Sequence, residues 1–255
     1  MTEYKPGAIR TSDEAKELQR VYKGLHKTNR EDALRAVVET LPELALRLSD
    51  YSRSCPYFQT RFEDQVTARL ETGLLAPEGN ADEPVLAASR AMFEAFDATA
   101  AQNIQKVCTQ VPEVTELHQR LEVDMPEAIR LLGRIMRWLN ALVLKNRVAE
   151  CAELKEALDD VVETIDELLN DTKTSLNDIV VYHASRSTLI TQLRKQQVLD
   201  IYLAIILLDA SRITDIREAY MSISDNFLLL CEQLHRKLDI LKKGSSEKMT
   251  AAIYY

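Results

Sequence analysis

The clearest helical pattern in the chain is the segment 199–243, LDIYLAIILLDASRITDIREAYMSISDNFLLLCEQLHRKLDILKK. Its apolar residues recur at intervals of three and four, which is typical of one face of an α-helix. They are Leu199, Tyr202, Ile206, Ile213, Ile216, Tyr220, Ile223, Phe227, Leu230, Leu234, Leu238 and Leu241. Because no Gly or Pro interrupts them and Gly244 follows as a stop signal, the segment predicts one long amphipathic helix, helix four.

The same spacing predicts three more helices upstream. They are helix one over about 12–50, helix two over about 103–145 and helix three over about 150–190, so that helices two to four together cover about 103–243. A polar break near 194–197 separates helices three and four, and Asn146 is a candidate C-cap after helix two. Bends are expected where Gly or Pro falls within or at the edge of a helix, at Gly24, Pro42, Pro112 and Pro126.

An insert of about 51–102 joins helices one and two. It holds five of the chain's Gly and Pro residues, so short helical pieces joined by turns are expected, with an exposed loop at 77–84. Its large apolar side chains are expected in the core or in an interface between subunits: Tyr57, Phe58, Phe62, Met92, Phe93 and Phe96.

Composition and helix length together predict the fold class. The 255 residues include only 6 Gly and 7 Pro and are 6% aromatic, which disfavours turn-rich β folds and favours an all-α protein. Four helices of about 40 residues, each about 60 Å long, are typical of an elongated antiparallel four-helix bundle. We therefore expect 1–255 to be a single bundle subunit. A second apolar stripe on helix four, at Leu203, Leu207 and Leu228, predicts a partner surface.

The charge balance and the chain's apolar runs exclude several classes of partner. With 32 Lys and Arg against 40 Asp and Glu, the net charge is −8, which disfavours nucleic acids and anionic membrane surfaces as partners. The first ten residues have no apolar core of signal-peptide length, and the longest apolar run, 203–208, is too short to span a bilayer. We expect a soluble intracellular protein.

Residues for catalysis or metal binding are sparse. The four cysteines form no Cys-x-x-Cys pair, so reduced and mostly buried thiols are expected. A ferritin-like metal enzyme needs two Glu-x-x-His pairs, and the chain has only Glu232 with His235. The remaining histidines are expected to be surface groups or groups with satisfied hydrogen bonds: His26, His118 and His183. With no Gly-rich phosphate loop and no Gly-x-Ser-x-Gly motif, the sequence predicts no enzyme activity, no metal and no cofactor.

The segment 244–255 predicts a docking tail. Lys242 and Lys243 end helix four, the following residues are mostly polar or small, and the sequence closes on Ile253, Tyr254 and Tyr255. Large apolar groups on a flexible arm favour a peptide anchor whose side chains fill a pocket on a partner. A tail that folds back on its own bundle is the alternative.

Several motifs within about 105–255 have the mutual spacing found in one known family. They are Trp138 and Leu139; Tyr182, Arg186, Thr191, Lys195 and Gln196; Asp215, Ile216, Arg217, Ala219 and Tyr220; Leu241, Lys242 and Lys243; and Ile253 with Tyr254 or Tyr255. On these residues the chain resembles the 11S proteasome activator family, also called REG.

The resemblance implies a function and a partner. Members of this family are rings, usually heptamers, of four-helix subunits that cap the 20S proteasome without ATP. Their tails dock between α-subunits of the α-ring, and an activation loop between helices two and three opens the gate. The resemblance therefore implies a homo-oligomeric activator of peptide hydrolysis, located in the cytoplasm, the nucleus or both.

Two of the family's contact elements are placed by this resemblance. Aligned through Trp138, the activation loop consists of Lys145, Asn146, Arg147, Val148, Ala149, Glu150, Cys151, Ala152 and Glu153, which include no Pro or Gly. The tail also fits the hydrophobic–Tyr–any residue pattern of ATPase-type proteasome regulators, so either Tyr254 or Tyr255 is a candidate for the main contact. The alternative function is that of a helical oligomeric scaffold or adaptor with no role at the proteasome.

Overall fold

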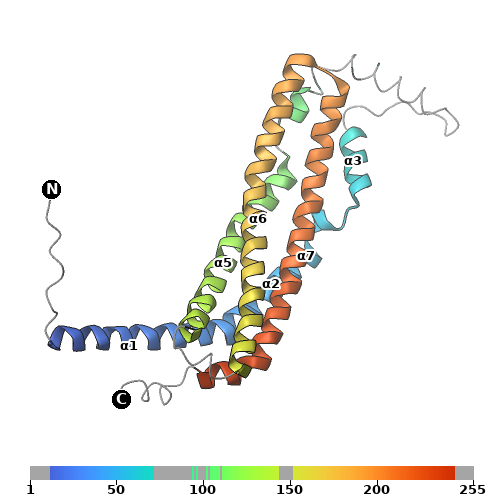
Figure 1. The fold of residues 1–255 in the computed structure, drawn as a ribbon. Helices are drawn as coiled ribbons and strands as arrows, with labels where there is room; N and C mark the ends of the chain where they lie inside the picture. Colours follow the sequence, from blue (N-terminus) through green and yellow to red (C-terminus); the bar gives the residue numbers. More distant parts are fainter. Residues whose placement is uncertain are drawn as a thin grey trace, which may run out of the picture. The chain divides into compact units, whose positions relative to one another are not determined.

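The computed structural model describes residues 12–71, 94, 96, 102, 104–109, 111–143 and 152–244. Within these residues every regular element is a helix, which confirms the predicted all-α class (Figure 1). The elements are α1 (Ser12–Arg35), the π-helix η1 (Ala36–Thr40), α2 (Leu41–Ser54), the 3-10 helix η2 (Pro56–Phe58), α3 (Phe62–Glu71), α5 (Pro112–Val143), α6 (Ala152–Gln196) and α7 (Leu199–Gly244).

The helix predicted over 12–50 is continuous through α1, η1 and α2, and it changes its winding next to Pro42. Proline has no N–H, and its ring clashes with the carbonyl group four residues earlier, here that of Val38. The wider π turn relieves this conflict, and the N–H of Leu41 donates to the carbonyl oxygen of Ala36, five residues back. By contrast, α1 passes through Gly24 with no change of winding.

The start of helix two differs from the prediction. Residues 104–108 form a short helical segment of their own, and neither Thr109 nor Val111 is helical. Pro112 then begins α5, because the first turn of a helix needs no N–H from this residue. The prediction of one helix from 103 with a kink at Pro112 is therefore wrong, whereas Pro126 does lie inside α5.

The connection between α6 and α7 is short. Gln197 adopts a left-handed φ of 47° and donates its N–H to the carbonyl oxygen of Leu193 at 2.8 Å. This hydrogen bond closes the end of α6 in the manner of a left-handed C-cap. The break lies at residues 197–198, at the end of the predicted 194–197 region, and helix three extends six residues beyond its predicted end at 190.

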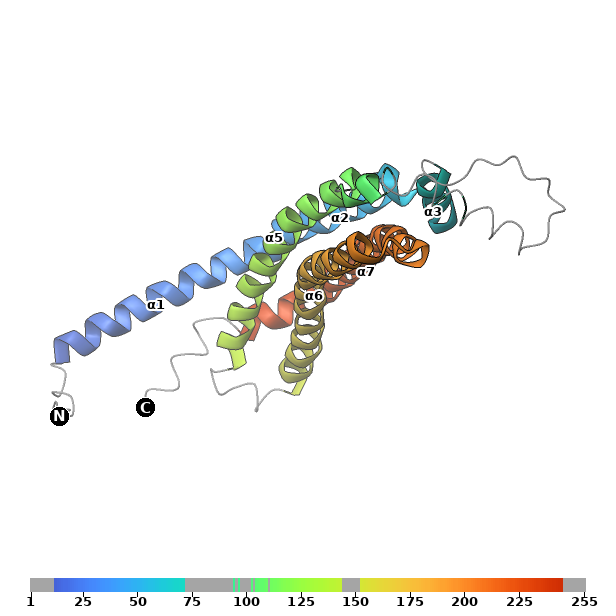
Figure 2. The same cartoon turned by 90° about the horizontal axis from the view of Figure 1, so that it is seen from above.

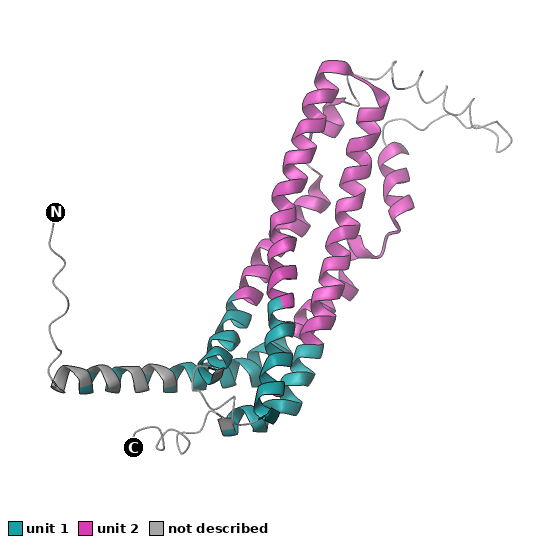
Figure 3. Cartoon of the chain, in the orientation of Figure 1, with its two compact units in different colours: residues 1–43, 130–166, 229–255 teal, residues 44–129, 167–228 magenta. Residues whose placement is uncertain are grey.

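Two compact units make up the chain (Figure 3). Unit 1 comprises residues 1–43, 130–166 and 229–255, and unit 2 comprises residues 44–129 and 167–228. Every buried polar or charged residue in the described part of the chain belongs to unit 2: Ser49, Gln65, His118, Asp124, Thr172, Ser175, Arg186, Asp209, Arg212 and Ser224. The buried side chains of unit 1 are apolar, with Ile135, Trp138 and Leu234 among them.

Side-chain contacts define the helix directions in unit 2. The contacts Arg47–Glu127 and Tyr51–Arg120 place α2 antiparallel to α5, since one number rises as the other falls. The contacts His118–Arg212 and Asp124–Tyr220 place α5 parallel to α7. Figures 1 and 2 show α6 and α7 side by side, and the contacts Thr164–Gln233 and Tyr182–Asp209 pair them antiparallel. This alternation is that of an up-and-down bundle.

Several apolar side chains of the insert pack in unit 2. Phe58 is buried against the rings of Tyr51 and Tyr220, which also pack on each other, and Phe96 packs on Tyr202 with 5.4 Å between ring centroids. Tyr57 instead donates a hydrogen bond to Glu116, and Phe62 is exposed. Met92 and Phe93 lie outside the described residues, as does the loop predicted at 77–84.

The second stripe of α7 is partly as predicted. Leu207 and Leu228 are exposed, but Leu203 packs against the buried cluster around Tyr202 and Ile206, so its assignment to a partner surface is wrong. Met221, which the sequence analysis did not assign to this stripe, is exposed and lies seven residues before Leu228. In the ranges described, no helix combines the length and apolarity needed to cross a membrane.

Candidate functional site

The start of α6 and the end of α7 lie together in unit 1. Lys237 forms an ion pair with Asp160, and the hydroxyl of Thr164 donates to Oε1 of Gln233 at 3.0 Å. Asp160 lies eight residues, about 12 Å, inside α6, and Lys237 lies seven residues, about 10 Å, before the end of α7. The first turn of α6 and the last turn of α7 therefore lie at the same end of unit 1 (Figure 1).

Only part of the predicted docking site falls within the described residues. Lys242 and Lys243 form the last turn of α7, where positive charge is favourable next to the unpaired carbonyl groups of a helix C-terminus. Gly244 ends this helix, as predicted. The tail residues Ile253, Tyr254 and Tyr255 lie outside the described residues.

The predicted activation loop is placed only at its final two residues. Ala152 and Glu153 form the first turn of α6 and are exposed, and their role in an activation loop stays a prediction. An acidic side chain there is stabilised by the positive end of the helix dipole. The rest of the predicted loop lies outside the described residues: Lys145, Asn146, Arg147, Val148, Ala149, Glu150 and Cys151.

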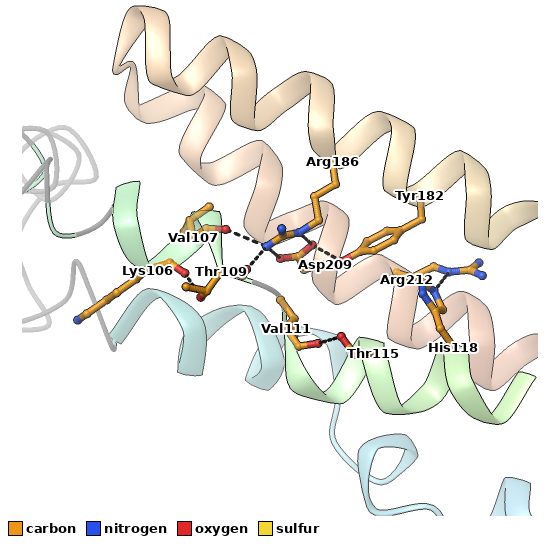
Figure 4. A network of polar contacts seen from close by, with 10 residues as sticks. All are labelled: Lys106, Val107, Thr109, Val111, Thr115, His118, Tyr182, Arg186, Asp209 and Arg212. Carbon is orange, nitrogen blue, oxygen red and sulfur yellow. Dashed lines mark hydrogen bonds and ion pairs between the residues drawn. The ribbon is translucent and has the colours of Figure 1, made fainter. Parts of the chain in front are cut away.

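A buried polar clamp joins α6, α7 and the segment 104–109 in unit 2 (Figure 4). The guanidinium of Arg186 contacts both carboxylate oxygens of Asp209, with Nε at 2.9 Å from Oδ1 and Nη2 at 3.2 Å from Oδ2. The same Nη2 donates to the carbonyl oxygens of Val107 at 2.8 Å and Thr109 at 2.9 Å. Arg186 thus caps the end of the short helical segment 104–108, just before α5 begins.

Tyr182 completes this clamp from one turn earlier on α6. Its hydroxyl donates to Oδ1 of Asp209 at 2.7 Å, and burial together with the Asp209 carboxylate raises the pKa of Tyr182. Tyr182 and Arg186 are two of the residues that carry the family resemblance. Asp209 was missed, although an acid inside the apolar stripe, between Ile206 and Ile213, was a signal of a buried partner.

A second buried pair lies beside the clamp. Nε of Arg212 donates to Nε2 of His118 at 3.0 Å, so the neutral imidazole carries its proton on Nδ1. Burial, with Arg212 and His183 nearby, lowers the pKa of His118 to about 4. Nδ1 of His118 and Nη2 of Arg212 are buried without a hydrogen-bond partner. The expectation that His118 is a surface or fully satisfied group is therefore wrong.

Asp124 is the other buried acid of unit 2. It accepts hydrogen bonds from Nε of Arg120 at 2.7 Å and from the hydroxyl of Tyr220 at 3.0 Å. Arg120 also lies over the ring of Tyr51, at 5.1 Å from its centroid. These contacts hold α2, α5 and α7 in one register, because a buried carboxylate is stable only where its partners are in reach.

The described residues hold no group of three or more metal-ligating side chains. Glu232, the acid of the single Glu-x-x-His pair, forms an ion pair with Arg236 one turn away. Cys55 is buried, Cys108 and Cys231 are half-buried, and all three are free thiols. Burial raises the pKa of Cys231 to about 11, so this thiol is a poor nucleophile at neutral pH.

These features define a helical bundle built around buried ion pairs, and comparison with known proteins identifies its family. The sequence profile described as "Proteasome activator PA28, C-terminal" matches residues 107–251. The chain therefore belongs to the PA28 family of proteasome activators. This family is regulatory, and membership supports a role as a proteasome activator.

Structural comparison agrees at the level of the fold. The crystal structure of the 11S subunit of the Plasmodium falciparum proteasome, PA28, superposes with a TM-score of 0.63 at 14% sequence identity. The match covers 94% of this chain and 99% of that one. The comparison with curated protein sequences gives no match.

Proposed function

We propose that this chain is a non-catalytic, ATP-independent activator that caps the 20S proteasome as a homo-oligomeric ring, a heptamer by its resemblance to the family. Ile253, Tyr254 and Tyr255 dock between subunits of the α-ring, and residues 145–153 act on the gate so that peptides enter. The observation that carries the proposal is the family match over 107–251. Its site of action is the cytoplasm, the nucleus or both.

The arrangement of unit 1 supports a common contact surface for the tail and the loop. The contacts of Asp160 with Lys237 and of Thr164 with Gln233 bring the start of α6 and the end of α7 to one end. The segment 144–151 leads into α6, and the segment 245–255 follows α7. The nearness of these two helix ends supports a proposal in which both segments meet the same surface of one partner.

Exposed apolar side chains on α7 support assembly into a ring. Leu207, Met221 and Leu228 are 46%, 45% and 37% exposed. They are separated by multiples of seven residues, so they share one face of the helix. An apolar stripe that its own unit leaves uncovered favours an interface with another subunit.

The tail contribution is expected to be weak for one subunit and strong for a ring. Burial of Ile253 and one tyrosine supplies on the order of a few kcal/mol. Once one tail is bound, the others bind at high effective concentration. A loss of about 1.4 kcal/mol per tail, tenfold at one site, therefore multiplies over several tails.

The test is hydrolysis of fluorogenic peptides by purified 20S proteasome. Three forms are compared: the full chain, a form that lacks Tyr254 and Tyr255, and a form with extra residues after Tyr255. We expect stimulation by the full chain only. Sedimentation velocity on all three is expected to show equal assembly, because the changes fall after the end of α7 and alter no residue of the helices. Equal stimulation by all three forms contradicts tail docking, and no stimulation by the full chain favours the scaffold alternative.

A further inference from the structure

Two exposed stripes of opposite charge lie on unit 1. On α5 the basic stripe consists of Arg130, Arg134 and Arg137, and on α6 the acidic stripe consists of Glu156, Asp159 and Glu163. All six side chains are exposed, and none has an ion-pair partner within the part of the chain that the structure describes. By contrast, the neighbouring Asp160 is paired with Lys237 on α7.

Both stripes point away from the core of unit 1. The buried residues of α5 in this unit include Leu132, Ile135 and Leu139, and those of α6 include Leu158, Val161 and Ile165. At 100° per residue, each charged stripe falls on the side of its helix away from these apolar residues. The charges are therefore open to another molecule.

The spacing of the two stripes is complementary in an antiparallel arrangement. From Arg137 back to Arg130 the steps are three and four residues, and from Glu156 on to Glu163 the steps are also three and four. Each stripe is thus about 10 Å long. Two antiparallel helices can place Arg137 against Glu156, Arg134 against Asp159 and Arg130 against Glu163.

The two stripes also lie at matching distances from one end of unit 1. α5 ends at Val143 and α6 begins at Ala152, at the same end (Figure 1). Arg137 lies about 9 Å along α5 from that end, and Glu156 about 6 Å along α6. Copies related by rotation about an axis parallel to the helices stay at one level. Such a rotation can therefore bring α5 of one copy against α6 of the next at the required height and in antiparallel direction.

We propose that the basic stripe of α5 binds the acidic stripe of α6 on a second copy of this chain. This inference rests on the ring of the proposed function and assigns a contact within it. Exposed ion pairs are individually weak, so the stripes chiefly select orientation and register, whereas apolar contacts supply most of the affinity. Assembly is therefore expected to weaken as salt shortens the range of the charges.

Charge reversal in the full chain tests the contact. The triple variant Arg130→Glu, Arg134→Glu, Arg137→Glu places like charges on both surfaces, and we expect the concentration needed for assembly to rise about tenfold or more. Adding Glu156→Arg, Asp159→Arg and Glu163→Arg to the same chain reverses both stripes and is expected to restore assembly. The readout is sedimentation velocity at about 50 mM and about 500 mM salt, with circular dichroism to verify the helical fold.

The matched control reverses three exposed arginines of unit 2, Arg53, Arg61 and Arg194, and changes the net charge by the same amount. We expect it to assemble like the wild-type chain. Normal assembly of the first variant, or failure of a folded six-residue variant to recover, overturns the proposed contact while the wild-type ring stands. A wild-type chain that sediments as a 29.0 kDa monomer overturns the ring itself and this contact with it.

Discussion

Replacement of Arg186 by Met tests whether the clamp holds unit 2 together. The substitution leaves the Asp209 carboxylate buried, with the Tyr182 hydroxyl as its remaining partner, and removes the donor from the carbonyl groups of Val107 and Thr109. Loss of one member of a buried ion pair costs about 3–5 kcal/mol. At about 2–4 °C per kcal/mol for a chain of this size, we expect the melting temperature to fall by about 6–20 °C.

Two comparisons separate the buried charge from the lost side-chain volume. The double variant Arg186→Met, Asp209→Leu removes both charges and is expected to be more stable than Arg186→Met alone. Arg186→Lys keeps the positive charge without the planar fork that reaches both the carboxylate and the carbonyl groups, so an intermediate loss is expected. The assays are thermal melting by circular dichroism and hydrogen exchange over 104–111, where exchange is expected to accelerate. If Asp209→Leu destabilises the Arg186→Met chain by as much as it destabilises the wild-type chain, the two residues are not coupled and the reasoning is refuted.

Two further predictions concern single positions. Because the pKa of His118 is about 4 in the fold, below its ordinary 6.5, the unfolded chain binds the proton first as pH falls. The contribution of His118 to the free energy of unfolding is thus constant above pH 6.5, and it falls by about 1.4 kcal/mol per pH unit between pH 6.5 and pH 4. In urea unfolding, we expect the free energy of unfolding of His118→Gln to fall by about 2–3 kcal/mol less than that of the wild type between pH 7 and 4.5. An equal fall for both proteins contradicts this. Gly133 lies in the middle of α5, and a methyl group there meets no atom within 4 Å. Gly133→Ala is therefore expected to raise stability by about 1 kcal/mol in the same assay, and a decrease contradicts it.

Periodicity predicted the long helices because each one buries a single continuous face. The pattern of helix four extends from Leu199 to Leu241, and α7 covers Leu199–Gly244. It failed at the start of helix two, where apolar residues continue across Val107 and Val111 although the backbone breaks between them. A pattern of side chains does not record that Arg186, 77 residues away from Thr109, stabilises the carbonyl groups exposed by that break.

The buried acids show a related limit. Asp124 and Asp209 stand beside apolar neighbours in the sequence. Each has partners on another helix, Tyr220 for Asp124 and Tyr182 with Arg186 for Asp209, and Asp124 also pairs with Arg120 on its own helix. Recognition of these pairs needs the packing of the bundle, which the linear sequence does not contain. The tail and the activation loop, in contrast, were assigned from sequence resemblance alone, and they stay predictions.

The distribution of buried polar groups distinguishes the two units physically. An apolar core is tolerant, since Leu and Ile side chains pack acceptably against many neighbours and a shift of one residue can be repacked. A buried carboxylate such as Asp124 or Asp209 does not tolerate such a shift, because loss of its partners leaves a buried charge without compensation. All the buried polar residues of the described chain lie in unit 2, so the register of its helices is specified by pairing as well as by packing. In unit 1 the core supplies packing alone, and the polar pairs that join α6 to α7 there, Asp160 with Lys237 and Thr164 with Gln233, are only partly buried, so water can compensate for the loss of a partner.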